Sequence, residues 1–311
     1  MTDIEVTAGE ARFREVLKIV GNPDPRDDID TASLVRRFPR LADVDVEQLE
    51  FEGPHGAIPA RAYRGPSEPQ AGLVWVHGGA FVAGSLDMPE SHWFGLELAS
   101  RGISVLAIDY RKALNGVHHP VPSDDVLAGW LVAANEPWLW GPATDRLFLG
   151  GASAGANLAT GVTVRLRAGE GPMPRGLVLV YPVLHAVVPP PSREAARAVR
   201  ALHADARFDD DFMLAINKNY LGSGGDFADQ VAFPANADAE GMPPALIINA
   251  EADDLRPSGE AYGAQLVDAG VDVSTLFEPG TSHGYLDLPG NPGALRSIER
   301  IVGWLGSRSA R

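Results

Sequence analysis

A serine flanked by small residues is the first feature of the sequence that indicates chemistry. Gly151-Ala152-Ser153-Ala154-Gly155 matches the pattern G-x-S-x-G and follows an apolar run. In that context the serine stands on a sharp turn between a strand and a helix, where its hydroxyl is exposed and the helix dipole favours negative charge. We predict that Ser153 is a nucleophile; the alternative is a small-residue turn that only closes a strand–helix unit.

A serine hydroxyl becomes a nucleophile only when a base removes its proton, so Ser153 requires partners. For a serine on a strand–helix turn, the chain order is serine, then carboxylate, then histidine. Asp253 and His283 follow this order, and each comes directly after an apolar run that is typical of a strand. We predict that they complete a triad, with Asp254 and Glu251 as competing carboxylates.

The segment HGGAF (77–81) also comes after an apolar run. Acyl transfer to a serine develops negative charge on the carbonyl oxygen, and preorganised backbone N–H groups stabilise that charge. Gly78 and Gly79 have no side chain to obstruct the approach, and Ala154 supplies an N–H just after the serine. We predict these three amides as an oxyanion hole; a glycine turn is the alternative for the segment.

Several large side chains are candidates for the lining of a substrate pocket, and ordinary packing explains each of them equally well. The adjacent His118 and His119 have no third ligand at a metal-binding spacing, so we predict no metal site and no cofactor. The candidates for the pocket lining are Phe81, Trp93, His185, Phe212, Met213 and Tyr285.

The elements that must position these residues alternate between strands and helices from residue 46 onward. Short apolar runs bounded by Gly, Pro or charge indicate strands buried on both faces. The alternation predicts an α/β fold with a mostly parallel sheet and helices on both faces. The predicted strands are an edge hairpin of 46–53 and 58–65, then 72–79, 104–110, 146–152, 176–183, 245–251 and 271–280; the helices are 89–102, 123–136, 153–169, 257–270 and 292–306.

Two regions do not follow this alternation, and both contain spaced apolar residues. We predict that they fold over one edge of the sheet as a cap. The chain then divides into an N-terminal cap segment (1–45), a first part of the core (46–184), a cap insertion (185–240) and a second part of the core (241–311).

Composition excludes several classes of protein. The 311 residues include no cysteine, which excludes disulfides and a thiol nucleophile. With 41 acidic against 26 basic residues the net charge is −15, which disfavours nucleic acid as a partner. No run approaches the roughly 20 apolar residues of a membrane span, and the N-terminus lacks a secretory pattern, so we predict no membrane partner and a cytoplasmic protein. The strand 271–280 would leave an exposed edge, and a homodimer through it is an open possibility.

Together these motifs resemble the hormone-sensitive-lipase family of α/β-hydrolases, in its bacterial esterase branch. The resemblance rests on HGGAF and GASAGANLA, with IDYRKA (108–113), VYPVL (180–184) and SHGY (282–285) aligned around them. It implies an α/β-hydrolase fold with a helical cap. It also implies that Ser153, Asp253 and His283 are the triad and that Gly78, Gly79 and Ala154 form the oxyanion hole.

The sequence departs from the family pattern at four places. Ala80 stands where a third glycine is usual, Ala152 precedes the nucleophile, and Asp254 replaces a proline beside the triad acid. The loop 112–119 replaces the usual L-A-P-E stretch. None of these departures removes a catalytic group.

The function that these features predict is a cofactor-free esterase for short-to-medium-chain neutral esters, which works through an acyl-enzyme. Because a neutral His283 would be the base, activity should rise with pH through about 6–7. An amidase or lactonase would use the same residues, and a non-catalytic small-molecule receptor on the same fold is the alternative from another class.

Overall fold

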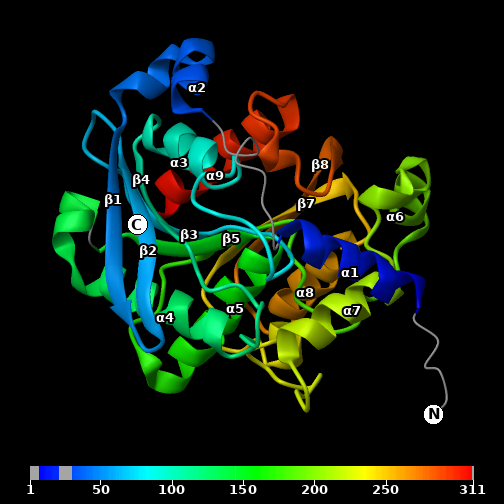
Figure 1. Cartoon of the computed structure of the whole chain (residues 1–311). Coiled ribbons are helices and arrows are strands. Elements are labelled where there is room, and N and C mark those ends of the chain that lie inside the picture. Colours follow the sequence, from blue (N-terminus) through cyan, green and yellow to red (C-terminus); the bar gives the residue numbers. More distant parts are fainter. Residues whose placement is uncertain (1–6, 21–29, 144, 310–311) are drawn as a thin grey trace.

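An eight-stranded sheet lies at the centre of the molecule (Figure 1). The structure is a computed structural model, and it describes residues 7–20, 30–143 and 145–309. The strand order is β1-β2-β4-β3-β5-β6-β7-β8. The strands are β1 (Asp45–Gly53), β2 (Gly56–Arg64), β3 (Ala71–Val76), β4 (Ile103–Ile108), β5 (Leu147–Ala152), β6 (Leu177–Val180), β7 (Ala245–Ala252) and β8 (Val273–Ser282).

The pairing of the strands confirms the predicted mostly parallel sheet. The hairpin β1–β2 is antiparallel, and β2 pairs antiparallel with β4 at one edge. From β4 to β8 all the pairs are parallel, so these strands have their carboxyl ends along one edge. Every residue of β3, β4, β5 and β6 is buried, which explains why these strands are continuous apolar runs.

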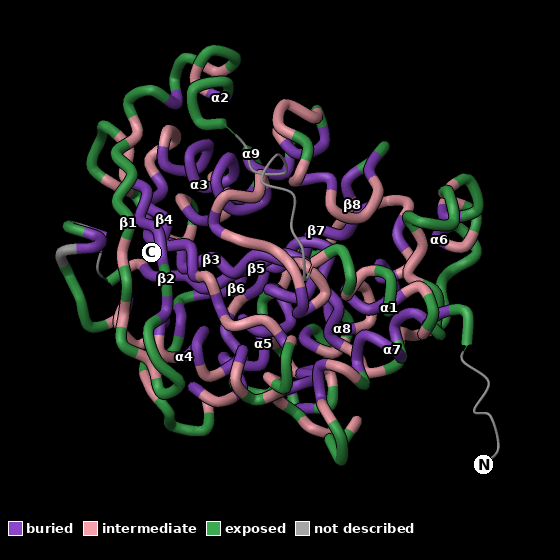
Figure 2. The backbone as a smooth tube through the Cα atoms, viewed as in Figure 1, coloured by how far each residue is buried: buried purple, intermediate pink, exposed green. Residues whose placement is uncertain are grey.

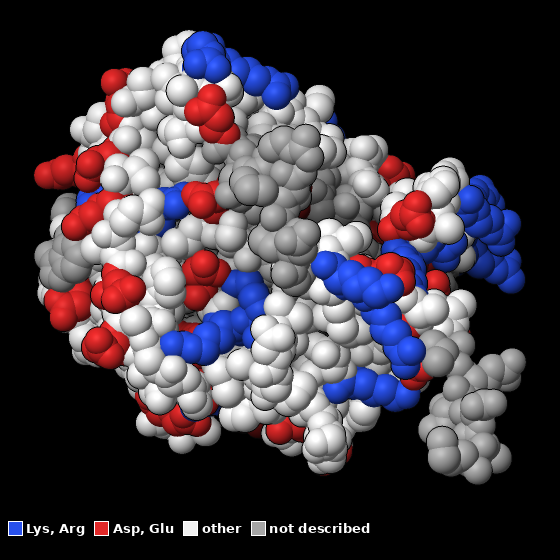
Figure 3. All heavy atoms as spheres, viewed as in Figure 1, with Lys and Arg blue, Asp and Glu red and all other residues white. Residues whose placement is uncertain are grey.

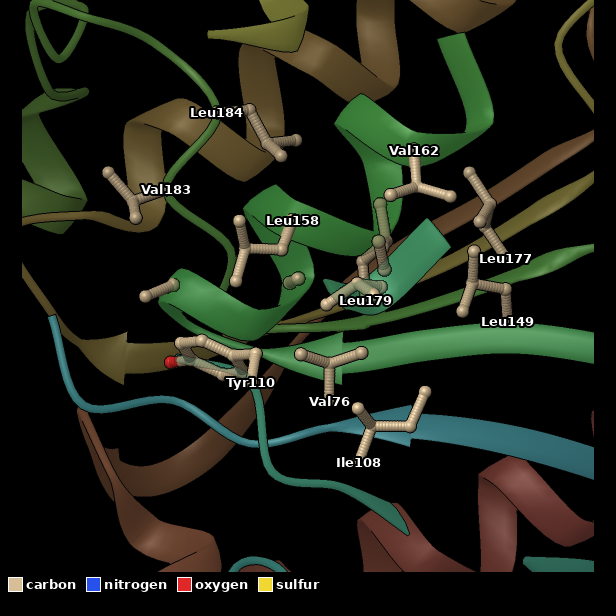
Figure 4. Close-up of a cluster of buried hydrophobic side chains, with 14 of the residues drawn as sticks. Val76, Ile108, Tyr110, Leu149, Leu158, Val162, Leu177, Leu179, Val183 and Leu184 are labelled. Carbon is tan, nitrogen blue, oxygen red and sulfur yellow. The ribbon is translucent and has the colours of Figure 1, made fainter. Parts of the chain in front are cut away.

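Helices cover both faces of the sheet, as predicted (Figure 1). One face carries α3 (His92–Ala99) and α9 (Pro292–Ser309), and the other carries α4 (Val121–Asn135), α5 (Ala154–Arg165) and α8 (Arg256–Asp268). The buried hydrophobic residues accordingly form two clusters, one for each face. Figure 2 shows how the buried backbone is concentrated in the sheet and the helices beside it. In Figure 4, Leu158 and Val162 of α5 lie over Val76 and Leu149 of the strands.

The predicted cap segments contain α1 (Ala8–Val20), α6 (Arg193–Ala198) and α7 (Asp210–Leu221), and α1 packs along α7. The Arg12 guanidinium joins the two parts by donating to the carbonyl oxygens of Arg207 and Asp205, both at 2.6 Å. On the face shown in Figure 3, Lys and Arg side chains lie over α1, α2 and α6, whereas most of the visible acidic side chains lie toward β1 and along the lower edge. The net negative charge is therefore unevenly distributed over this face.

Residues 1–45 do not form one cap segment, and this part of the predicted division is wrong. Helix α2 (Thr31–Arg37) packs beside α3 rather than α7, because Leu34 belongs to the cluster on the α3 face and the Thr31 hydroxyl bonds His92 at 2.8 Å. Residues 1–6 and 21–29 of the predicted segment lie outside the described residues. No helix within the described parts of the chain is long and apolar enough to cross a membrane.

Candidate active site

Ser153 stands alone between β5 and α5 on a turn that only small neighbours allow. Its backbone lies at φ 51° and ψ −121°, a conformation that L-residues rarely adopt. A Cβ on Gly151 would lie 2.4 Å from the carbonyl carbon of Gly155, and a Cβ on Gly155 would lie 2.1 Å from the Val76 carbonyl oxygen. The two glycines of the motif are therefore required by the close packing of β5, α5 and β3.

The structure brings Ser153, Asp253 and His283 together in one hydrogen-bonded chain. The His283 Nε2 lies 2.9 Å from the Ser153 Oγ, and its Nδ1 lies 2.7 Å from an Asp253 carboxylate oxygen. Asp253 follows β7 and His283 follows β8, so both project from the carboxyl edge of the parallel strands, as Ser153 does. With Nδ1–H donating to the carboxylate, Nε2 is left to accept the serine proton.

The two competing carboxylates have other partners. Asp254 accepts two hydrogen bonds from the Arg207 guanidinium at 2.7 and 2.8 Å, and a third from the Phe208 N–H at 2.8 Å. Glu251 accepts the N–H of Gly280 at 2.7 Å. Asp253 itself is 1% exposed, and the second oxygen of its carboxylate accepts the N–H of Leu255. Of the three candidates, Asp253 is the one that faces the imidazole.

The surroundings of His283 favour its protonated form. Burial works to lower the pKa of this histidine, but the charge and hydrogen bond of Asp253, with the charges of Glu90 and Asp287, outweigh burial and raise the pKa. A base with a raised pKa is a stronger proton acceptor once it is neutral, and it becomes neutral at a higher pH.

The backbone N–H groups of the segment after β3 differ in whether they already have a hydrogen-bond partner. The N–H of Gly78 donates to the Glu90 carboxylate at 2.5 Å, so it is not free for an oxyanion, and its predicted role is wrong in this structure. Among the described residues no hydrogen bond occupies the N–H of Gly79 or of Ala80. Ala154 opens α5, where the first amides of a helix have no partner within it. The free amides near the nucleophile are thus those of Gly79, Ala80 and Ala154.

Three of the predicted pocket residues have the contacts of packed side chains. Trp93 is fully buried beside Phe38, and its indole N–H donates to Glu97 at 3.0 Å, so it lies in the core. The hydroxyl of Tyr285 bonds Ser297 at 2.7 Å. Met213 is a buried member of the cluster on the α5 face.

The other three predicted pocket residues lie in or next to the cap and the loops of the sheet edge. Phe81 stacks on Tyr220 of α7 with ring centroids 3.9 Å apart. His185 bonds the Ser258 hydroxyl at 2.9 Å. Phe212 contacts Phe208, and the Phe208 ring in turn contacts His283.

Sequence reasoning missed the two rings that contact the imidazole. Phe208, from the cap, lies 4.6 Å from His283 between ring centroids and 5.8 Å from Phe212. Tyr181, just after β6, lies 4.9 Å from His283 on the core side. Tyr181 belongs to the block VYPVL (180–184), so its place in the family pattern could have pointed to it. Nothing in the sequence of the cap indicates Phe208.

The structure shows what surrounds three of the four departures from the family pattern. Nothing in the structure explains Ala152. Asp254 anchors the cap through Arg207, as described above. Ala80 adopts φ 51°, the left-handed region in which glycine is the usual residue. In the loop 112–119, Lys112 donates to an Asp109 carboxylate oxygen and to the Tyr110 carbonyl, both at 2.6 Å, which ties the loop to the end of β4.

Comparison with known proteins agrees with this architecture. A family model described as the α/β-hydrolase fold matches residues 73–287. The chain therefore belongs to the α/β-hydrolase fold family.

Individual relatives are esterases. An ethyl acetate hydrolase of Pseudomonas putida is 32% identical over 237 residues, which cover 74% of this chain and 72% of the relative. The solved structure of a Pyrobaculum calidifontis esterase is 27% identical, has a TM-score of 0.74, and covers 96% of this chain and 98% of its own. Brefeldin A esterase, described as a bacterial homologue of human hormone-sensitive lipase, shares the fold at 22% identity and a TM-score of 0.74, over 99% of this chain and 87% of its own. The resemblance inferred from the motifs is confirmed.

Proposed function

We propose that this protein is a serine carboxylesterase, and the hydrogen-bonded chain from Ser153 through His283 to Asp253 is the observation that carries the proposal. The Ser153 oxygen attacks the ester carbonyl while His283 Nε2 takes the hydroxyl proton. The tetrahedral intermediate collapses, His283 returns that proton to the departing alcohol, and an acyl-serine ester remains. Water then attacks the acyl group with His283 again as the base, which releases the acid and restores the serine.

We infer that the amides of Gly79, Ala80 and Ala154 hold the carbonyl oxygen as its charge develops. Each has a backbone N–H without a hydrogen-bond partner among the residues that the structure describes. Mutational losses at such sites are about 10²- to 10³-fold in kcat for each donor removed. Gly79 and Ala80 follow β3, and Ala154 follows β5 as the first residue of α5, so the three amides lie after the carboxyl ends of two neighbouring parallel strands.

For the substrate we propose neutral esters of short to medium chain length. Phe208 packs against His283 from the cap side, which leaves the imidazole covered by a fixed ring. The similarity to an ethyl acetate hydrolase supports small esters, and the net charge of −15 disfavours anionic ones. Amides and lactones require the same groups, so a panel of matched ester, amide and lactone substrates decides among these activities.

The test is the Ser153→Ala variant assayed on p-nitrophenyl acetate. We expect a loss of at least about 10⁴-fold in kcat, because no other group replaces the nucleophile. Thermal unfolding of the variant close to that of the wild type is the control for folding. Hydrolysis near the wild-type rate would refute the proposal.

We also propose a homodimer through β8, which lies at the end of the strand order and has one side free of a strand partner within the described residues. An unpaired edge strand is a template for pairing with a second copy. Light scattering coupled to size exclusion tests this directly: a mass of twice 33.0 kDa supports the dimer, and a mass of 33.0 kDa at high concentration refutes it. The cytoplasmic location stays a prediction.

A further inference from the structure

Glu90 is a buried carboxylate that the mechanism above does not use. It lies between β3 and α3, and 2% of the residue is exposed. Its Oε1 accepts the N–H of Gly78 at 2.5 Å, and its Oε2 accepts the hydroxyl of Tyr181. A carboxylate gives up its hydration on burial, so such a group is retained where hydrogen bonds replace the water. These bonds place Glu90 between the loop that bears the free amides and the ring that packs on His283.

Gly78 is held at both of its backbone groups. Its N–H donates to Glu90, and its carbonyl oxygen accepts the Tyr110 hydroxyl at 3.1 Å and lies 2.7 Å from the Nδ1 of His77. A peptide unit is planar and trans, so the N–H of Gly79 points away from the carbonyl of Gly78. The direction of the first free amide therefore depends on how Gly78 is held.

The next peptide unit is held in the same way. The carbonyl of Gly79 accepts the N–H groups of Val82 at 3.0 Å and Ala83 at 2.8 Å, so the N–H of Ala80 points to the opposite side. A Cβ on Gly78 would lie 2.8 Å from the Glu90 Oε1 and 3.1 Å from the Ser153 Cβ. The carboxylate thus packs directly behind the part of the loop that lies next to the nucleophile.

The backbone of Glu90 is fixed as well. Its N–H donates to an Asp287 carboxylate oxygen at 3.0 Å, and its carbonyl accepts the indole N–H of Trp75 at 2.9 Å. Burial raises the pKa of Glu90, and burial followed by the charge of Glu90 raises the pKa of Asp287 to about 8. Glutamine is a close substitute for Glu90 on geometric grounds, because its amide oxygen can accept the Gly78 N–H and its N–H can donate to the Tyr181 oxygen.

We propose that Glu90 is a positioning residue of the oxyanion hole, whose bond from the Gly78 N–H anchors the start of the loop from which the Gly79 and Ala80 amides project. This inference rests on the proposed function. Glu90 acts through the backbone and does not touch the substrate. The hydrogen bond that it accepts is what matters, and its charge is not required.

Three substitutions of Glu90 distinguish the effect of its side-chain length, which brings an acceptor to Gly78, from the effect of its charge. Glu90→Gln keeps an oxygen within reach of Gly78 and offers an N–H to the Tyr181 oxygen, so we expect kcat within about fivefold of the wild type. Glu90→Asp keeps the charge but withdraws the carboxylate by one methylene, and Glu90→Ala removes the acceptor. For both we expect kcat to fall about 10²-fold, the size of loss typical of a misplaced catalytic group. KM should stay within about twofold, because these amides bind the charge that develops in the transition state.

Glu97 offers the matched control, since it is a second fully buried glutamate a short distance along the chain. Its carboxylate bonds Arg40, Arg101 and the Trp93 indole, and none of these partners belongs to the triad or to the segment 77–81. We expect Glu97→Gln and Glu97→Ala to lower the unfolding temperature and to leave kcat and KM near the wild-type values. An equal fall in kcat for the Glu97 and Glu90 variants would make the effect one of stability and overturn the proposal.

Two further outcomes would also overturn it. If Glu90→Asp keeps its kcat while Glu90→Gln loses it, the charge matters and the reach does not. If Glu90→Asp and Glu90→Gln both keep their kcat, Gly78 needs no acceptor. The order of these two variants decides the question even where Glu90→Ala does not fold. Failure of the wild type to hydrolyse any ester would instead refute the proposed function, so the two failures are distinguishable.

Discussion

Asp253 and Asp254 are neighbours in sequence with opposite environments, and together they provide a matched pair of perturbations. Asn replaces Asp with almost no change of shape, so Asp253→Asn and Asp254→Asn each remove one negative charge from the same turn. We predict that the first abolishes most of the activity and that the second alters mainly the binding of substrate.

The magnitude for Asp253 follows from its contact with His283. The carboxylate oxygen lies 2.7 Å from Nδ1, and the residue is 1% exposed. Without the charge, the imidazolium that forms during the reaction loses its counter-charge at a buried carboxylate position. An Asn N–H also favours the tautomer in which Nε2 carries the proton and cannot accept one. Comparable changes cost about 10⁴-fold in kcat, which is about 5.5 kcal/mol of barrier.

The magnitude for Asp254 is much smaller. Its side chain holds Arg207 and the backbone of Phe208, and Phe208 lies against His283. Weakening one partly exposed charged pair costs about 1–2 kcal/mol, or at most about 5- to 30-fold in the fraction of protein with the cap in place. We expect KM to rise within that range and kcat to stay within about fivefold.

The assay is steady-state hydrolysis of p-nitrophenyl acetate by both variants, with thermal unfolding as the measure of folding. An Asp254→Asn variant as inactive as Asp253→Asn would refute the assignment of the triad acid. So would an Asp253→Asn variant that keeps more than about a tenth of the wild-type kcat.

Three more predictions follow from the structure. The surroundings of His283 raise its pKa, so log(kcat/KM) should rise with pH through a value above 6.5, the ordinary pKa of histidine, and then level off. A profile that is flat between about pH 5 and 9 would contradict the role of His283 as the base. Gly155→Ala should lower the free energy of unfolding by more than about 3 kcal/mol, because its Cβ would lie 2.1 Å from the Val76 carbonyl oxygen. Gly303→Ala in α9, where no atom lies within 4 Å of the new Cβ, should raise the free energy of unfolding by about 1 kcal/mol. Chemical denaturation measures both, and equal effects of the two substitutions would contradict the packing argument. Phe208→Ala should shift the preference in a p-nitrophenyl ester series toward longer acyl chains, and an unchanged series would show that this ring does not limit the pocket.

The sequence predicts the sheet well because buried parallel strands leave a strong local pattern. The runs 72–79 and 104–110 overlap the observed β3 and β4 at all but the first residue of each strand, and the edge hairpin and final strand are found within two residues of their predicted bounds. The order of Ser153, Asp253 and His283 follows from where such strands end. These features depend on residues close together in the chain, so that local spacing is informative.

The features that the sequence could not provide depend on contacts between distant segments. Phe208 lies against His283, and Arg207 beside it bonds Asp254, 47 residues away in sequence. The sequence predicts that the Gly78 N–H binds the oxyanion because a glycine has no side chain to obstruct it. The sequence around Gly78 does not reveal that Glu90, 12 residues later, accepts this N–H. Helix α2 packs beside α3 and not beside α7. The spacing of apolar residues predicts a helix there but not the helix against which it packs.

The central claim is that Ser153 becomes acylated during turnover. Reaction of the wild type with a fluorophosphonate, followed by peptide mass spectrometry, measures this directly. We predict a single adduct on the peptide that contains Ser153, and strongly reduced labelling of the His283→Ala variant, which lacks the base. A folded wild-type protein that stays unlabelled, or that carries its adduct at another residue while it hydrolyses esters, would contradict the account.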